Sequence, residues 1–244
     1  MTVEESEVRQ AVCDGGYVLA AAGQSDLIWG HVSARDPAGR GVWMKQAGLG
    51  FEEVKSEDVL LVSPAGAVLR GSGRRHVEYP IHTEVLPVRP DVGSVVHTHA
   101  ASSIAFAALG VPLRPISHEG TLFVPPDLAR FTGTTGLIRT SQLGSDLARA
   151  LSARNAVLIP GHGVVTVGPD VITAVMTAVL LDRACRLQLS VEGAGGPRTW
   201  TGDEESLRKR AECWPSAQLE AGYAHLLRQA TAGRATAVVR PAGD

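Results

Sequence analysis

The pair His97 and His99 is the part of the sequence best suited to chemistry. Residues 95 and 96 before it are both valine, which is typical of the end of a buried strand, and a helical pattern begins at Ala100. In an extended chain, residues two positions apart project from the same face, so both rings point the same way. Two neighbouring imidazoles are costly to protonate together, and a divalent metal ion is a common reason for such a pair. An isolated pair also occurs as one core histidine and one exposed histidine, so the metal hypothesis needs further ligand candidates.

Two other segments supply those candidates. Glu78 precedes the pair, and His162 follows it in a Gly-His-Gly turn between two short apolar segments that are typical of buried strands. Zinc and related ions bind imidazole nitrogen and carboxylate oxygen, and a catalytic site leaves positions open for substrate. We therefore predict a metal site formed by Glu78, His97, His99 and His162. Whether Glu78 binds the metal or acts only as an acid and base stays open at this stage.

The order of these residues resembles the class II aldolase and adducin family. The matching features are acid-x-x-x-His in Glu78–His82, His-Thr-His in His97–His99, and His-Gly at His162. The segment Gly30–Pro37, GHVSARDP, also resembles the early strand motif of that family, and the resemblance extends from about residue 5 to residue 228.

The resemblance implies an α/β fold, a three-layer αβα sandwich with a mostly antiparallel central sheet. It implies one class II aldolase/adducin-like domain over residues 1–244, and a homotetramer with sites at subunit interfaces. The family includes fuculose- and rhamnulose-phosphate aldolases, ribulose-phosphate 4-epimerase, several metal-dependent decarboxylases, and adducin, whose related domain is taken to be non-catalytic. In the aldolases the acid that matches Glu78 also serves in proton transfer. The expected cofactor is a divalent metal ion, with Zn²⁺ as the first expectation and Mn²⁺, Fe²⁺ or Co²⁺ as alternatives.

This chain departs from the sugar-phosphate members of the family. Those members have Gly-Asn-x-Ser in the early strand and two serines before the acid, and these small donors and backbone amides hold the phosphate. Here His31 replaces the asparagine, His76 and Val77 replace the serines, and residues 45–48, KQAG, fill the place of a Thr-Gly phosphate loop. A valine offers a phosphate dianion no hydrogen bond. We therefore expect a substrate without a phosphate.

The residues expected to bind the substrate are His31, Lys45, Arg75 and Tyr223. Lys45, Arg74 and Arg75 could hold a carboxylate, and an arginine grips one with two parallel hydrogen bonds. Taken alone, each of these three cations is more often solvated surface charge.

The predicted catalytic residues are Glu78, His118 and Glu119. His118 and Glu119 lie in the proline-rich segment 111–120, which we expect to be an irregular loop, and catalytic groups favour loops on rigid scaffolds. Nothing in the sequence fixes where this loop points, so a surface role stays open for both. His82 follows Glu78 by one helical turn, and it is expected either to orient Glu78 or to lie on the helix surface.

Hydrophobic periodicity and breaking residues predict the elements that position these side chains. The predicted helices cover residues 3–23, 80–88, 100–109, 141–153, 169–191 and 203–228. The predicted strands cover residues 27–33, 41–44, 58–63, 67–69, 156–160 and 164–167.

Composition excludes several classes of protein. The chain has 244 residues, 44% of them hydrophobic, and a formal net charge of −2, so it can bury a sizeable core and shows no sign of a nucleic-acid or membrane partner. The longest apolar run, around residues 174–181, is too short to span a bilayer. The N-terminal residues are acidic and polar, unlike a secretory signal. The three cysteines are odd in number and widely separated, which argues against a disulfide framework. We expect a soluble cytoplasmic protein with a small-molecule substrate.

The sequence predicts a metal-dependent carbon–carbon lyase. The preferred reaction is decarboxylation of a non-phosphorylated, hydroxylated carboxylic acid, aromatic acids included, through an enolate that the metal stabilises as a Lewis acid. Aldol cleavage shares that intermediate, so an aldolase or 4-epimerase acting on a sugar phosphate is the first alternative. An iron-dependent oxygenase is a further alternative, because three histidines and a carboxylate also suit iron. A non-catalytic, adducin-like interaction domain is the alternative from another class.

Overall fold

Eight strands form one sheet through the middle of the protein, in the order β4-β3-β2-β1-β5-β8-β7-β6. Every neighbouring pair is antiparallel except β6 and β7. The strands are β1 His31–Arg35, β2 Val42–Lys45, β3 Val59–Val62, β4 Val68–Arg70, β5 Ser94–Thr98, β6 Ala129–Arg130, β7 Ala156–Ile159 and β8 Gly163–Gly168. The computed structural model describes residues 2–238, with side chains through residue 232.

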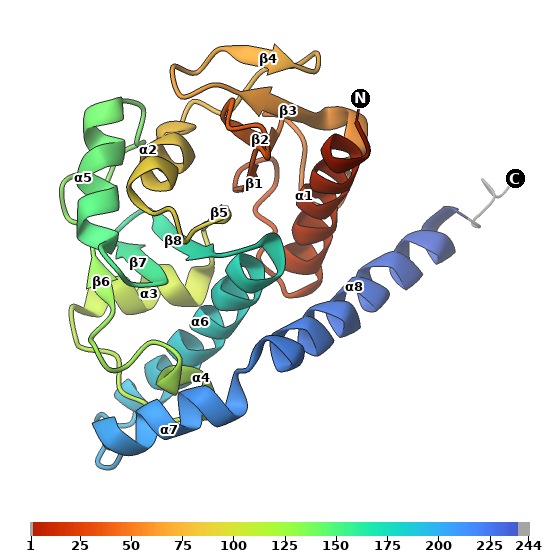
Figure 1. Ribbon diagram of the computed structural model, residues 1–244. Helices are drawn as coiled ribbons and strands as arrows, with labels where there is room; N and C mark the ends of the chain where they lie inside the picture. Colours follow the sequence, from red (N-terminus) through yellow and green to blue (C-terminus); the bar gives the residue numbers. More distant parts are fainter. Residues whose placement is uncertain (1, 239–244) are drawn as a thin grey trace, which may run out of the picture.

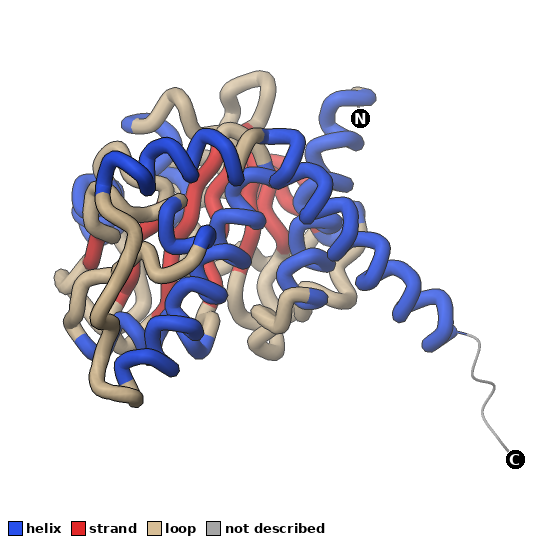
Figure 2. Tube along the Cα trace, turned by 90° about the horizontal axis from the view of Figure 1, so that it is seen from below, coloured by secondary structure: helices blue, strands red, loops and turns tan. Residues whose placement is uncertain are grey.

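Helices cover both faces of this sheet (Figures 1 and 2). The helices are α1 Val3–Ala21, α2 Pro80–Val88, α3 Ala101–Leu109, α4 His118–Thr121, α5 Ser141–Leu151, α6 Val171–Glu192, α7 Asp203–Cys213 and α8 Ser216–Val238, with a 3-10 turn at Ser56–Asp58. Helices α1, α3, α6 and α8 share one hydrophobic core with the sheet, and α2 and α5 share another on the opposite face. The prediction of an αβα sandwich with a mostly antiparallel sheet is confirmed.

Strand β5 lies between β1 and β8 at the centre of the sheet. All five of its residues are buried, and His97 pairs with His31 on one side and with Val165 on the other. Gly30 allows the chain to enter β1 at this point: its φ is +74°, and a Cβ atom there would meet the Phe51 ring at 3.1 Å and the His97 carbonyl oxygen at 3.3 Å. The β7–β8 hairpin turns at Gly161, φ +75°, which places His162 at the same end of the sheet as His97.

Helix α2 fixes the position of Glu78. The helix begins at Pro80, where the missing backbone N–H costs nothing because the first turn has no intrahelical acceptor for it. Gly144 of α5 lies so close to α2 that a Cβ atom would meet the Glu84 Cγ and the Pro80 carbonyl oxygen, each at 2.7 Å. The close packing of α2 on α5 therefore holds the segment that carries Glu78.

Three predicted elements differ from the structure. The strand expected over residues 27–33 begins only at His31, because Asp26 and Trp29 form a turn and Leu27 adopts φ +50°. The segment 111–120 is not wholly irregular, since Ser117 caps the short helix α4 by accepting the Gly120 N–H. The helix expected over residues 203–228 is two helices, because Pro215 cannot continue α7. Strand β6 was not predicted at all, and at two residues it is too short to show a hydrophobic period.

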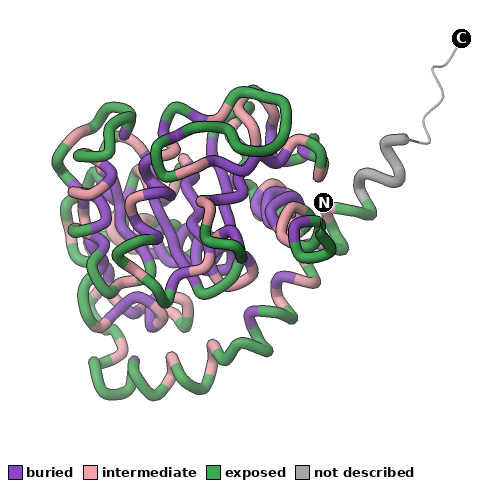
Figure 3. Tube along the Cα trace, turned by 45° about the horizontal axis from the view of Figure 1, so that its top comes forward, coloured by how far each residue is buried: buried purple, intermediate pink, exposed green. Residues whose placement is uncertain are grey.

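The last helix, α8, extends away from the body of the protein (Figure 1), and most of it is exposed (Figure 3). Leu219 and Tyr223 are its buried residues, and they belong to the core that α1 and α6 share. Among the described residues, no helix is both long and apolar enough to cross a membrane.

We predict that Gly144→Ala lowers the free energy of unfolding by about 1–3 kcal/mol, because the added methyl group must push α5 away from α2. Gly193→Ala is the matched control, since a Cβ atom there meets nothing closer than 3.6 Å and the backbone is already helical. Denaturant titration of both variants measures the difference. Equal midpoints for the two variants would show that the α2–α5 contact has room for a methyl group.

Candidate metal centre

The four predicted ligands lie together at one end of the sheet. Glu78 precedes α2, His97 is in β5, His99 follows β5, and His162 is in the β7–β8 turn, and one ligand atom from each lies within 4.8 Å of the others. Glu78 and His97 are buried, and His99 and His162 are partly buried. The structure therefore brings together a carboxylate and three imidazoles from segments far apart in the sequence.

Hydrogen bonds fix which nitrogen of two rings is free to bind a metal. His97 Nδ1–H donates to the Val164 carbonyl oxygen at 3.0 Å, and His99 Nδ1–H donates to Asp26 Oδ2 at 2.8 Å. Each ring is thus left with a lone pair on Nε2, and the two Nε2 atoms are 3.2 Å apart. Ligand nitrogens of a tetrahedral zinc ion are about 3.3 Å apart, given a bond length of about 2.0 Å. The spacing suits a shared cation, and outer partners such as Asp26 are typical of metal-binding histidines.

Glu78 and His162 complete the cluster. Glu78 Oε1 accepts the Ile138 N–H at 2.7 Å and lies 3.5 Å from His162 Nε2. Neither ring nitrogen of His162 makes a hydrogen bond within the described chain, although both are buried. A buried polar atom without a partner is costly, and a metal ion would satisfy one of the two nitrogens. The donor set and the free His162 nitrogens therefore fit a divalent cation.

The charges of the cluster also suit a cation. Burial alone would raise the pKa of Glu78, but His162, His97 and the Ile138 N–H outweigh it and lower that pKa to about 2. Burial lowers the pKa of His97 to about 3, with only part of the effect opposed by Glu78. At neutral pH the site therefore presents an ionised carboxylate and a neutral imidazole, which are the forms that bind metals.

Three further histidines pack behind the cluster. The ring centroid of His31 lies 4.5 Å from that of His76, 4.8 Å from that of His82 and 5.0 Å from that of His97. His82 is fully buried and hydrogen-bonds to His31 and to Ser33, each at 2.6 Å. Both expectations for His82 are therefore wrong: it does not orient Glu78 by a hydrogen bond, and it does not lie on the helix surface. Burial lowers the pKa of His76 and of His82 to about 3.

Lys45 places a positive charge next to this group. Its Nζ donates to the Ile28 and Leu49 carbonyl oxygens and lies 3.3 Å from His76 Nε2, so all three of its N–H groups have partners. The residue is only 2% exposed, and burial lowers the pKa of Lys45 to about 8, which still leaves it mostly protonated at neutral pH. Within the described part of the chain, no carboxylate forms an ion pair with Lys45.

A cavity of about 500 Å³ opens onto the cluster. It is lined by Asp26, Trp29, Gly30, His31, His76, Val77, Glu78, His99, Leu137, Gly161 and His162. Trp29, Val77 and Leu137 form an apolar rim and are 51%, 52% and 42% exposed. The cavity thus has a polar imidazole wall inside and an apolar rim outside.

Of the predicted catalytic residues, His118 and Glu119 do not line this cavity within the same chain. Both are in α4, where Glu119 forms an ion pair with Arg183 of α6 at 3.3 Å. The His118 carbonyl oxygen accepts the Trp214 indole N–H at 2.9 Å. Their catalytic role stays a prediction.

Of the predicted substrate-binding residues, only His31 lines the cavity. Lys45 lies behind His76 and reaches the cavity only through that ring. The Arg75 guanidinium packs over the Tyr79 ring, 4.0 Å from its centroid, and donates to the Gly66 carbonyl oxygen. Tyr223 is buried in the core beneath α8. A substrate contact by Arg75 or Tyr223 therefore stays a prediction that this chain alone does not support.

No local pattern in the sequence indicates that Asp26, Trp29 or Leu137 belongs to the site. Asp26 and His99 are 73 residues apart, and their hydrogen bond depends on how the turn before β1 folds back. Trp29 looked like a strand residue because its neighbours are apolar. Leu137 lies beside Ile138, whose N–H binds Glu78, in a segment without periodicity.

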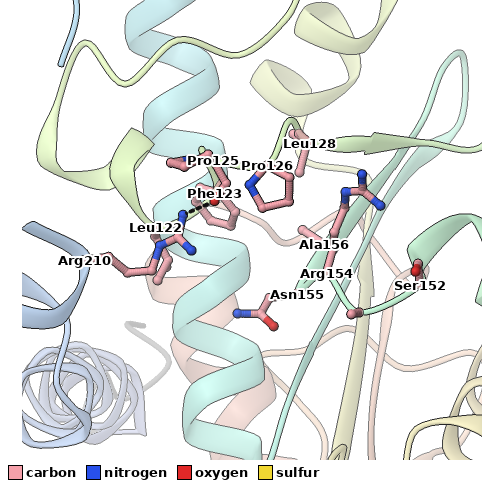
Figure 4. Close-up of a pocket in the computed structure, with 11 residues that line it drawn as sticks. Leu122, Phe123, Pro125, Pro126, Leu128, Ser152, Arg154, Asn155, Ala156 and Arg210 are labelled. Carbon is pink, nitrogen blue, oxygen red and sulfur yellow. Dashed lines mark hydrogen bonds between the residues drawn. The ribbon is translucent and has the colours of Figure 1, made fainter. Parts of the chain in front are cut away.

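A second cavity, of about 270 Å³, lies near α7 and the start of β7 (Figure 4). Its lining is apolar apart from a few polar side chains, among them Arg154 and Arg210, and includes no histidine or carboxylate. Arg210 donates to the Thr121 and Pro125 carbonyl oxygens, so its guanidinium supports the loop between α4 and β6. This cavity holds none of the groups that metal chemistry needs.

Comparison with known proteins agrees with the fold. The family model for the class II aldolase and adducin N-terminal domain matches residues 10–189. The chain therefore belongs to the class II aldolase and adducin family.

Individual proteins agree with this assignment. The chain is 33% identical to a 3,4-dihydroxyphthalate decarboxylase of Arthrobacter keyseri over 202 residues, which are 77% of this chain and 80% of that protein. It is 34% identical to the enzyme of the same name from a Terrabacter species, over 77% of this chain and 82% of that one. The solved L-fuculose 1-phosphate aldolase of Glaciozyma antarctica is 24% identical, with a TM-score of 0.82 over 96% of this chain and 92% of that chain. The last likeness concerns the fold alone.

We predict that His97→Ala, His99→Ala and His162→Ala each lose bound metal while the fold is kept, because the two hydrophobic cores do not include these rings. The loss of affinity should exceed the 10- to 100-fold range that is typical for partners outside the ligand set. His225→Ala, an exposed histidine of α8, is the control. Metal content is measured by mass spectrometry on protein purified without a histidine tag. Stoichiometric metal in the three variants would show that the cluster is not the metal site.

We predict that Asp26→Asn weakens metal binding about 10- to 100-fold, because the neutral amide no longer orients the His99 ring or raises its basicity as a carboxylate does. Asp146→Asn is the matched control: its carboxylate is similarly exposed, at 32% against 37% for Asp26, and lies on the far helix α5. Competition with a chelating dye gives both affinities. Equal affinities in the two variants would contradict the role given to Asp26.

Proposed function

We propose that the protein is a divalent-metal-dependent carbon–carbon lyase that decarboxylates a non-phosphorylated, hydroxylated carboxylic acid, aromatic acids included. The observation that carries the proposal is the wall beside the metal cluster, where His31 and His76, with buried Lys45 behind His76, occupy the positions of the small phosphate donors expected in sugar-phosphate members. The decarboxylases among the relatives support the same reaction class. A divalent cation held by Glu78, His97, His99 and His162 would supply Lewis-acid stabilisation of the negative charge that develops as the carbon–carbon bond breaks.

The charge of the wall favours a carboxylate over a phosphate. Lys45 is buried without an ion-pair partner among the described residues, so an anion in the cavity gains from its field in a medium of low dielectric. A phosphate dianion needs several N–H and O–H donors at once, and Val77 supplies none at the position where the aldolases have a serine. A carboxylate needs fewer donors and suits this wall better.

Glu78 is the residue that we assign to proton transfer. Its Oε1 is held by the Ile138 N–H, whereas its Oε2 takes no hydrogen bond from the described residues and lies 3.9 Å from His97 Nε2. An ionised carboxylate at the cavity can accept a proton at Oε2 from a substrate hydroxyl and return it to the carbon that loses the carboxyl group. Glu78 thus has two tasks, as a ligand and as a proton carrier.

The rim of the cavity supports an aromatic acid within this class. Trp29, Val77 and Leu137 expose apolar surface at the mouth, and an aromatic ring between them would bury that surface and pack against the indole. A small aliphatic acid would leave most of the rim in water.

The homotetramer stays part of the proposal, because it would give His118 and Glu119 a role. In the single chain both lie outside the cavity that holds the cluster, so they can act on the substrate only in the cavity of a neighbouring subunit. His118→Ala and Glu119→Gln should then keep their metal and lose turnover, and light scattering should give four chains per particle.

We predict that the metal-loaded protein releases carbon dioxide from 3,4-dihydroxyphthalate or another hydroxylated aromatic acid, and that Glu78→Gln loses far more turnover than metal. The amide keeps one carbonyl oxygen but can neither carry the proton nor supply the charge. Carbon dioxide and aldehyde release are measured over a panel of hydroxylated acids and sugar phosphates. Turnover of fuculose 1-phosphate at ordinary enzyme rates would favour the aldolase alternative. Protein that binds no zinc, manganese or iron would favour the adducin-like interaction domain.

A further inference from the structure

A buried hydrogen-bonded chain runs from the sheet to the cavity. Ser33 Oγ is 2.6 Å from His82 Nδ1, and His82 Nε2 is 2.6 Å from His31 Nδ1. Ser33 and His82 are completely buried, whereas His31 lines the cavity. These two hydrogen bonds therefore occupy both ring nitrogens of His82 and Nδ1 of His31, so only Nε2 of His31 is left to contact a ligand.

The direction of the protons in this chain follows from a count of donors and acceptors. If His31 Nδ1 carried a proton and donated to His82, then His82 would donate to Ser33, and the Ser33 hydroxyl proton would need another acceptor. The described residues offer Ser33 Oγ no hydrogen bond other than the one to His82, and a buried hydroxyl proton without an acceptor is costly. In the opposite direction every group is satisfied: Ser33 donates to His82 Nδ1, and His82 Nε2–H donates to His31 Nδ1.

We propose that Ser33 and His82 hold His31 as a hydrogen-bond donor, with Nε2–H directed at an anionic oxygen of the substrate that stays in the product. Because a protonated Nε2 has no lone pair, His31 faces the cavity as a donor and not as a fifth metal ligand, although its ring centroid is only 5.0 Å from that of His97. Ser33 and His82 are positioning residues, since neither lines the cavity. The substrate contact rests on the proposed function, whereas the proton arrangement does not.

Ser33→Ala removes the hydroxyl group that sets the direction of hydrogen-bond donation from Ser33 through His82 to His31. Without the hydroxyl, no partner at Nδ1 of His82 favours either neutral tautomer of that ring. Since His82 sets the proton position on His31, His31 then becomes a mixture of its two neutral tautomers. If only a fraction of the molecules carries Nε2–H, the apparent affinity falls by the reciprocal of that fraction, and the KM for the acid rises about two- to tenfold. The kcat stays unchanged, because the contact is the same in the ground state and the transition state.

Ser94→Ala is the matched control. Ser94 is also completely buried in the sheet, on the neighbouring strand β5. Its hydroxyl donates to the Ser33 backbone carbonyl oxygen at 2.7 Å and, among the described residues, makes no hydrogen bond to the Ser33 hydroxyl, His82 or His31. Both substitutions remove one buried hydroxyl hydrogen bond, so both should cost similar stability. Only Ser33→Ala should change the protonation of His31.

The experiment uses ¹⁵N-histidine labelling of the zinc-loaded protein, with long-range proton–nitrogen spectra that separate protonated from unprotonated ring nitrogens. We expect an unprotonated Nδ1 and a protonated Nε2 for His31 in the wild type and in Ser94→Ala, and averaged shifts in Ser33→Ala. A protonated Nδ1 in the wild type, or a Ser33→Ala spectrum identical to the wild type, would overturn the proposal.

The kinetic arm uses 3,4-dihydroxyphthalate, or whichever acid of the panel is turned over. A higher KM with unchanged kcat in Ser33→Ala alone supports the substrate contact, and an unchanged KM overturns it. If no acid is turned over, the proposed function fails, and the nitrogen spectra still decide the proton arrangement.

Discussion

The pairing of β5 with β1 and β8 is the constraint on which the site depends. Since side chains alternate along a strand, a shift of one residue in either pairing would move His31 or His97 to the opposite face of the sheet. The two hydrophobic cores oppose such a shift, because Val32 and Ala34 of β1 pack in one core, whereas Val95 of β5 packs in the other. The positions of the imidazoles are thus set by the packing of valines and leucines that take no part in chemistry.

Burial gives these imidazoles a common property. The six imidazoles of the cluster and of the group behind it cannot all be protonated, and burial lowers the pKa of His31, His76, His82 and His97 below the ordinary histidine value. The charged side chains at this end of the sheet are then Glu78 and Asp26 on the metal side, and Lys45 behind His76 on the opposite side. A ligand that places one negative charge near Lys45 and oxygen atoms near the metal cluster would complement both regions of the site.

The four residues of the cluster could be predicted from the sequence to lie together, whereas their hydrogen-bond partners could not. His97 and His99 lie two residues apart at the end of a short apolar strand, and His162 lies in a glycine turn, so the local pattern is sufficient. Ser33, His82 and Asp26 depend on partners about 50 to 70 residues away, which no local pattern records.

The elements show the same division between local and distant information. The helices from Pro80 and Ala101 were predicted almost to the residue, because their periodicity and breakers are local. The apolar residues 27–29 predict a strand, but they precede β1, and Trp29 lies exposed at the cavity rim. The division of the last helix has a local signal in Pro215, which cannot continue α7, and the expectation of one helix over residues 203–228 overlooks it.

The strand order also governs how the chain reaches this structure. His97 contacts Val164 across 67 residues, and Ser94 contacts Ser33 across 61, so the central strands can pair only after long loops have closed. Chains dominated by such distant pairings fold slowly compared with helical bundles. Helices α2 and α3 can form early, but Glu78, His97 and His162 stay apart until the sheet is complete. A metal ion that needs all of these residues would therefore bind late in folding, and the rate of its uptake after dilution from denaturant would report the closure of the sheet and not the formation of the helices.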